Sequence, residues 1–105
     1  MPSKNKSRGN KLETEVVKLF EKYSLLAKRA WGSNGKALGE HEEVDVLLPA
    51  NKTSERSLKI QCKRKKKLPD WLGFTEHVDA VVVREDRGKK FLLIEFEDFI
   101  KRYLV

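Results

Sequence analysis

The chain has 105 residues, of which 37% are charged and 39% hydrophobic, and its formal net charge is +7. This length suits one domain with one modest core, and the apolar fraction is large enough to exclude global disorder. No apolar stretch is long enough for a signal peptide or a membrane span, and the single cysteine, Cys62, excludes an internal disulfide. We therefore expect a cytoplasmic protein with no membrane partner.

Positive charge is concentrated in two segments that contain no acidic residue, residues 1–11 and 56–67. Such clustering is typical of proteins that bind a polyanion. A solvated basic surface without a partner is the alternative for a run of lysines. The residues expected to contact nucleic acid are Lys6, Arg8, Lys11, Arg29, Arg64, Lys65 and Lys66.

Hydrophobic periodicity and turn residues predict an α/β fold. In chain order, the predicted elements are a flexible basic arm (1–6), a helix (7–23), three strands (25–31, 44–48 and 58–63), a short helix (69–77), two strands (79–84 and 91–96) and a closing helix (99–104). The strands over 44–48 and 58–63 are expected to pair as a hairpin. Residues 7–105 would then form a single domain, with a mixed sheet of about five strands flanked by helices.

Glu13 lies within the apolar face of the first predicted helix, where a helical wheel places it between Phe20 and Val17. A carboxylate in that position costs free energy unless it is paired or bound to a metal. The alternative is a capping box, in which Asn10 caps the helix and Glu13 bonds back to it.

Strand parity places a second carboxylate near polar residues of a neighbouring strand. Side chains two apart on a strand share a face, so Gln61 and Lys63 lie opposite the apolar side of their strand. Pairing the two strands by their apolar faces brings Asp45 beside Gln61 and Lys63. Two carboxylates and a nearby lysine suit metal-assisted phosphodiester hydrolysis, because hard oxygen ligands bind Mg²⁺. Alternatively, Asp45 caps the preceding loop at the edge of its strand.

The order of these segments resembles the archaeal-type Holliday junction resolvases, which belong to the PD-(D/E)xK nuclease superfamily. Residues 9–20 resemble the first helix of that family, with Glu13 as its catalytic glutamate, and residues 29–33 resemble its Arg-x-x-Gly-Ser segment. Asp45 and residues 60–63 are similar to its metal-binding Asp and its Glu-x-Lys motif. The match covers about residues 6–67.

This resemblance implies a restriction-endonuclease-like fold, Mg²⁺ as cofactor with Mn²⁺ as a substitute, and a role in DNA recombination. It implies a homodimer that cuts a four-way (Holliday) DNA junction at two symmetric positions. The implied catalytic residues are Glu13, Ser33, Asp45, Gln61 and Lys63, and the implied metal ligands among them are Glu13, Asp45 and Gln61. The dimer contact is a candidate role for Trp71, Leu72 and Phe74, with packing against their own sheet as the alternative.

The chain departs from the family pattern at two places. The glutamate of the Glu-x-Lys motif is Gln61 here, and the loop between Ser33 and Asp45 is longer. An amide oxygen can bind a metal but carries no negative charge, so we expect weaker Mg²⁺ affinity. Alternatively, a carboxylate of the acid-rich loop supplies the missing charge, the candidates being Glu40, Glu42 and Glu43, or that loop is simply solvated.

Three functions follow as hypotheses. The first is a metal-dependent, structure-selective DNA endonuclease that resolves four-way junctions. The second is a DNA-binding module of the same fold that has lost catalysis, with Gln61 as the mark of that loss. The third is a small basic RNA-associated protein, which would show no metal dependence and would bind RNA more tightly than branched DNA.

Overall fold

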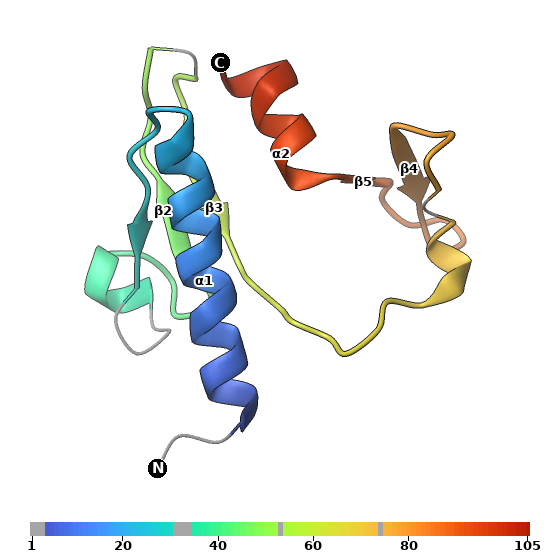
Figure 1. Ribbon diagram of the computed structural model, residues 1–105, viewed down its shortest axis with the longest axis horizontal. Helices are drawn as coiled ribbons and strands as arrows, with labels where there is room; N and C mark the ends of the chain where they lie inside the picture. Colours follow the sequence, from blue (N-terminus) through green and yellow to red (C-terminus); the bar gives the residue numbers. More distant parts are fainter. Residues whose placement is uncertain (1–3, 31–34, 53, 74) are drawn as a thin grey trace. The chain divides into compact units, whose positions relative to one another are not determined.

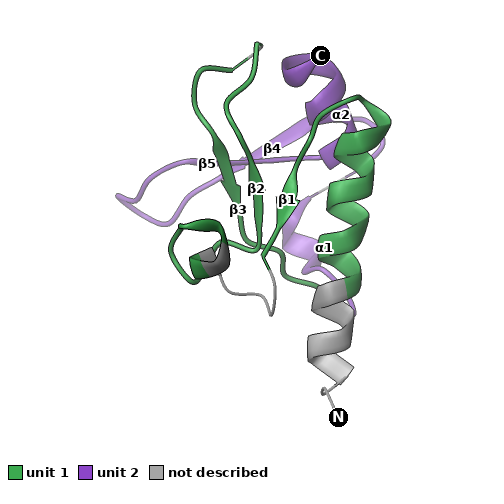
Figure 2. Ribbon diagram, turned by 90° about the vertical axis from the view of Figure 1, so that its left-hand side faces the viewer, with its two compact units in different colours: residues 1–64 green, residues 65–105 purple. Residues whose placement is uncertain are grey.

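The computed structural model describes residues 4–30, 35–52, 54–73 and 75–105. These residues form a small α/β protein with two α-helices, a three-stranded sheet and a two-stranded sheet (Figure 1). The chain divides into two compact units, residues 1–64 and 65–105, which Figure 2 colours separately. The single domain that the sequence predicts over residues 7–105 stays a prediction. None of the helices in the described ranges is long and apolar enough to cross a membrane.

The first unit consists of one long helix and a small antiparallel sheet. Its elements are α1 (Lys4–Lys22), β1 (Lys28–Arg29), a short 3-10 helix (Gly35–Leu38), β2 (Val46–Leu48) and β3 (Leu58–Ile60). The strand order is β1-β2-β3, and both pairings are antiparallel. The predicted hairpin of the second and third strands is therefore confirmed, although all three strands are shorter than predicted.

Helix α1 begins earlier than the sequence pattern indicates. It starts at Lys4, so it includes residues 4–6 of the predicted arm, and Ser7 and Asn10 lie inside the helix rather than at its cap. Lysine is a good helix former, and one interior glycine costs only about 1 kcal/mol, so Gly9 does not stop the helix. The capping-box interpretation of Glu13 is wrong, because Asn10 is not a cap.

The C-terminal end of α1 is closed by a Schellman motif. The Leu25 N–H donates to the Phe20 carbonyl at 3.0 Å, and the Ser24 N–H donates to the Glu21 carbonyl at 2.9 Å. Ser24 adopts a φ of 60° to make this reversal. The two apolar ends of the motif, Phe20 and Leu25, are both buried. This turn directs the chain from α1 into β1.

The core of the first unit lies between α1 and one face of the sheet, and α1 packs on β1 and β2 (Figure 1). Val46 pairs with Arg29 on one side and with Ile60 on the other. Directly paired residues share a face, and Arg29 on that face reaches α1, so the helix covers this side. Among the residues of this unit whose burial the structure describes, the buried apolar ones are Phe20, Leu25, Ala30, Val44, Val46 and Leu48.

The second unit is built on a β-hairpin followed by a helix. Its elements are a 3-10 turn (Asp70–Leu72), β4 (Ala80–Val83), β5 (Phe91–Ile94), α2 (Phe96–Phe99) and a π-helical continuation (Ile100–Leu104). The predicted helix over 69–77 is thus a single turn, because Gly73 follows it with a φ of 69° and ends it. The predicted order of helix, three strands, helix, two strands and helix is otherwise confirmed. Arg102 fastens the final helix through ion pairs to Asp98 at 2.8 Å and Asp79 at 3.3 Å.

Candidate functional site

Glu13 is one of the most deeply buried side chains of the protein, with 2% of its surface exposed. Arg29 of β1 donates from Nε to Glu13 Oε2 at 3.1 Å and from Nη1 to the Thr14 hydroxyl at 3.3 Å. The prediction that Glu13 faces the core and needs a partner is confirmed. Sequence reasoning assigned Arg29 to nucleic-acid binding and missed this pairing, whose only sequence signal is a buried carboxylate that requires a cation.

Asp45 is the second buried carboxylate, with 7% of its surface exposed. It lies immediately before β2, and its backbone continues the ladder with β1, since the Ala30 N–H donates to the Asp45 carbonyl at 2.8 Å. Its side chain reaches in the other direction, where Oδ2 accepts the Cys62 N–H at 2.8 Å. Asp45 thus joins the ends of all three strands of the sheet.

Regular pairing between β2 and β3 ends at Asp45. The register pairs Val46 with Ile60, and continuing it would place Asp45 opposite Gln61, as predicted. Instead, the Asp45 N–H donates to the Ile60 carbonyl at 2.8 Å, one residue short of that register. The Asp45 carboxylate then takes the place of a ladder acceptor for Cys62. Such bulge-like departures re-aim side chains and are common beside active sites.

The negative charges of Glu13 and Asp45 both act on the Cys62 thiol. Burial, together with the negative charges of Asp45 and Glu13, raises the pKa of this thiol from its ordinary 9.0 to about 12. A helix residue and a strand residue that are 32 positions apart therefore act on one point. Cys62 itself is a free thiol that sequence reasoning did not include in the site.

Gln61 and Lys63 are exposed, whereas Leu58, Ile60 and Cys62 are partly buried. This alternation confirms the predicted parity of residues 58–63. The expected DNA contacts Lys11, Arg64, Lys65 and Lys66 are also exposed. The side chains of Lys6 and Arg8, and the whole of Ser33, lie outside the described part of the chain.

The acid-rich loop lies partly against the sheet. Glu40 Oε2 forms an ion pair with Lys59 Nζ at 3.1 Å, and Lys59 is on the strand that leads to Gln61. Glu42 and Glu43 are exposed, and the backbone N–H of Glu43 donates to His41 Nδ1 at 3.1 Å. Of the three loop carboxylates, Glu40 is therefore the one that contacts β3.

The donor set at this site is compatible with a hard divalent cation. Glu13 and Asp45 supply carboxylate oxygens, the ligands that Mg²⁺ prefers, whereas Gln61, the third predicted ligand, is exposed and alternates with Cys62, on which both carboxylates act. Within the described ranges, no group of three or more His, Cys, Asp or Glu side chains is placed to hold a metal ion. The predicted ligand set contains only two residues of those types, because its third member is a glutamine.

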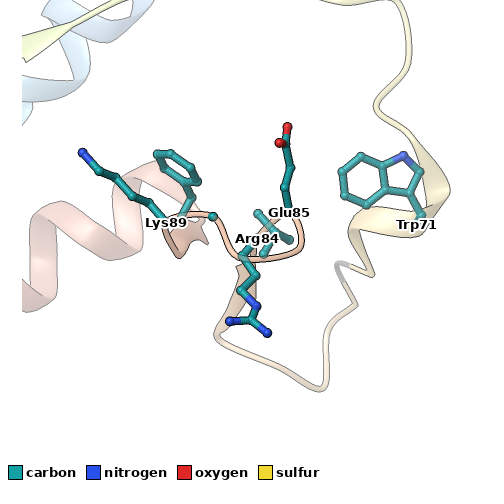
Figure 3. Close-up of a pocket in the computed structure, with 7 residues that line it drawn as sticks. Trp71, Arg84, Glu85 and Lys89 are labelled. Carbon is teal, nitrogen blue, oxygen red and sulfur yellow. The ribbon is translucent and has the colours of Figure 1, made fainter.

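A separate pocket lies in the second unit, with a volume of about 430 Å³. Its lining comes from the turn at Trp71 and from the β4–β5 hairpin, including Val83, Glu85 and Phe91 (Figure 3). Trp71, proposed from the sequence as a dimer contact, is 73% exposed at this pocket. Leu72 is partly buried, and Phe74 lies outside the described residues.

No protein-family model, curated protein or solved structure matches this chain. The resemblance to Holliday junction resolvases therefore stays a prediction from the motifs quoted above.

Proposed function

We propose that this chain is a metal-dependent, structure-selective DNA endonuclease that resolves four-way junctions. The observation that supports this most directly is the pair of buried carboxylates, Glu13 and Asp45, which come from different elements and act on the same thiol. Burying two charges is unfavourable unless a cation or a hydrogen-bond network compensates them. A purely structural role would be served at lower cost by apolar residues, which favours a functional site.

The proposed ligands of Mg²⁺, or of Mn²⁺ in its place, are Glu13, Asp45 and Gln61. A divalent cation there would activate water and neutralise charge on the scissile phosphate. Asp45 is held for this role by the Cys62 N–H, which leaves its second oxygen for other contacts. Lys63 follows Gln61 on the exposed side of the same segment, where an ammonium can stabilise the negative charge of the phosphate in the transition state.

DNA binding is assigned to the exposed basic side chains around the site. Lys11 precedes Glu13 by two residues on α1, and Arg64, Lys65 and Lys66 directly follow Lys63. Cations at these positions would contact phosphates without reading sequence. The finer parts of the proposal are a restriction-endonuclease-like sheet built from all five strands, a homodimer and a cytoplasmic location, all of which rest on the resemblance.

The decisive experiment is a cleavage assay on a four-way DNA junction with Mg²⁺ or Mn²⁺, using the parent chain and Asp45→Asn. Asparagine keeps an oxygen acceptor for the Cys62 N–H but removes the charge, so the fold should persist while the cation site is lost. We expect cleavage by the parent only, with junction binding of the variant within a few-fold of the parent.

Other outcomes separate the alternatives. Metal-independent junction binding by the parent, without cleavage in either cation, would indicate a binding module that has lost catalysis. Tighter binding to RNA than to the junction would indicate an RNA-associated protein. Undiminished cleavage by Asp45→Asn would exclude the proposed metal site.

A further inference from the structure

Arg29 occupies the position of a counter-ion at Glu13. The Glu13 side chain is only 3% exposed, and the guanidinium bonds to it at 3.1 Å. A carboxylate buried to this degree cannot stay charged without a positive partner or several hydrogen bonds. Arg29 supplies such a positive partner, and its planar guanidinium donates to the carboxylate from Nε.

The Arg29 side chain is also exposed enough to leave its ion pair with Glu13. Its side chain is 32% exposed, ten times the exposed fraction of Glu13, so the guanidinium borders solvent. Its second contact, from Nη1 to the Thr14 hydroxyl at 3.3 Å, is a neutral hydrogen bond that water can replace. Glu13 is fixed in the interior on a helix, whereas Arg29 has a long side chain that can turn towards solvent.

We infer that Arg29 and a divalent cation are alternative partners of Glu13, so that the cation displaces Arg29 when it binds. This inference rests on the proposed function, since it concerns the same metal site. Two positive groups cannot both occupy the space beside one buried carboxylate without mutual repulsion. The displaced guanidinium is then available to a DNA phosphate, which reconciles the nucleic-acid role predicted for Arg29 with its observed pairing to Glu13.

A competing role and a purely structural role of Arg29 predict opposite changes in cation affinity when Arg29 is removed. If Arg29 only held the site in shape, its removal would leave cation affinity unchanged or lower it. If Arg29 competes with the cation, its removal raises cation affinity. The same removal takes a positive partner away from a buried carboxylate, so the metal-free protein should lose thermal stability and regain it as the cation binds.

The test is a calorimetric titration of Mn²⁺ into the parent, Arg29→Gln and Thr14→Val, with thermal unfolding measured with and without Mn²⁺. We expect Arg29→Gln to bind Mn²⁺ about fivefold more tightly or better, the lower end of typical coupling between sites. Thr14→Val removes the hydroxyl that holds Nη1 but neither charge, and nearly preserves side-chain volume. It should increase Mn²⁺ affinity by a smaller factor, and it tests the exchange even where Arg29→Gln folds poorly.

Glu13→Gln combined with Arg29→Gln is the matched control, because it removes both members of the pair. This double variant should lose both the gain in affinity and the stabilisation by Mn²⁺. Parent-like or weaker Mn²⁺ binding by both Arg29→Gln and Thr14→Val would overturn the exchange while leaving the proposed metal site intact. Absence of Mn²⁺ binding in the parent and in all variants would overturn both proposals.

Discussion

Gln61 is the residue at which the chain leaves the resolvase pattern, and it follows β3 with an exposed side chain. Gln61→Glu would restore a negative ligand of nearly the same size. If Gln61 is a metal ligand, cleavage at low Mg²⁺ should increase or hold, because added negative charge strengthens binding of a hard cation. The measurement is cleavage rate against Mg²⁺ and Mn²⁺ concentration for the parent, Gln61→Glu and Gln61→Ala.

Glu40, which forms an ion pair with Lys59 of β3, is the alternative source of the negative charge that Gln61 lacks. If Glu40 already supplies the missing charge, Gln61→Glu would place like charges together and reduce activity, and Glu40→Gln would be the damaging change. Glu42→Gln serves as the matched substitution, since Glu42 is exposed in the same loop. Identical metal curves for all three residues at position 61 would show that Gln61 is not a ligand.

The raised pKa of the Cys62 thiol makes the free energy of unfolding depend on pH above pH 9. The thiol has an ordinary pKa of 9.0, which burial and the charges of Asp45 and Glu13 raise to about 12 in the folded protein. Below pH 9 the thiol is protonated in both the folded and the unfolded chain, so its contribution is fully present there. Between pH 9 and about 12 only the unfolded chain releases the proton, so the free energy of unfolding falls as pH rises.

We therefore expect stability to decline more steeply above pH 9 in the metal-free parent than in Cys62→Ala. Chemical denaturation of both proteins across this range measures the difference, because the two proteins share every other ionisable side chain. Parallel curves would contradict the burial of Cys62 together with its proximity to the two carboxylates. In the Asp45→Asn variant the decline should be shallower than in the parent, because one of the two charges is gone.

At the scale of elements, the basic segment after β3 is the clearest candidate for phosphate contact. Replacing Arg64, Lys65 and Lys66 together by glutamine should weaken binding to every DNA and flatten its salt dependence. Each phosphate contact contributes about −0.9 to the slope of log affinity against log salt on duplex DNA, so the loss should approach three such units. Fluorescence anisotropy at several salt concentrations measures this slope.

A charge-matched control distinguishes local contact from net charge. Replacing Lys89, Lys90 and Lys101, which are exposed in the second unit, removes the same charge from other elements. This triple variant should change the slope much less. Equal slopes for the two triple variants would place the DNA surface elsewhere, and Lys11 would become the first candidate.

Periodicity predicted the type and order of the elements but not their ends. The helical spacing of α1 located its buried face, and alternation located the buried side of residues 58–63. The start of α1 differs from the prediction, because Ser7 and Asn10 are favoured at helix caps and yet both lie inside the helix. The short helix after the basic segment ends earlier than its apolar pattern predicts, because Gly73 adopts a left-handed conformation and terminates it after one turn.

The site was predictable to the extent that local patterns encode burial. The helical wheel identified Glu13 as buried, and strand parity identified Asp45. Each carboxylate interrupts a pattern of apolar residues in its own segment. Their partners were not predictable in this way. Arg29 is 16 residues from Glu13, and Cys62 is 17 residues from Asp45, and such contacts depend on how α1 and the strands pack.

At the scale of the whole molecule, charge and apolar surface are unevenly distributed between the units. Residues 1–64 contain 14 basic and 8 acidic residues, whereas residues 65–105 contain 9 basic and 8 acidic residues. The large exposed apolar side chains of the described chain include Trp71, Val82, Phe91 and Leu92, all in the second unit. The excess of positive charge suits the first unit, together with Lys65 and Lys66 at the start of the second, to contact phosphates, and the nearly balanced charge of the second unit opposes contact with another protein surface less.

The proposed homodimer yields the last prediction, because two symmetric cuts in a junction require two active sites in one assembly. A dimer with one parent chain and one Asp45→Asn chain should cut a single strand. On a plasmid that carries a cruciform, paired cuts give linear DNA and a single cut gives an open circle. Two different affinity tags allow the mixed dimer to be purified, and the two pure dimers serve as controls.

We expect linear product from the parent dimer, open circle from the mixed dimer and neither from the Asp45→Asn dimer. This result would show that each chain contributes its own Asp45 to one cut, since asparagine offers an oxygen to the Cys62 N–H and should preserve the fold around β2 and β3. Sedimentation of the parent as a monomer at the concentrations of the assay would contradict the dimer. Linear product from the mixed dimer at the parent's rate would instead mean that one intact site makes both cuts in succession, and symmetry would then have no role in the reaction.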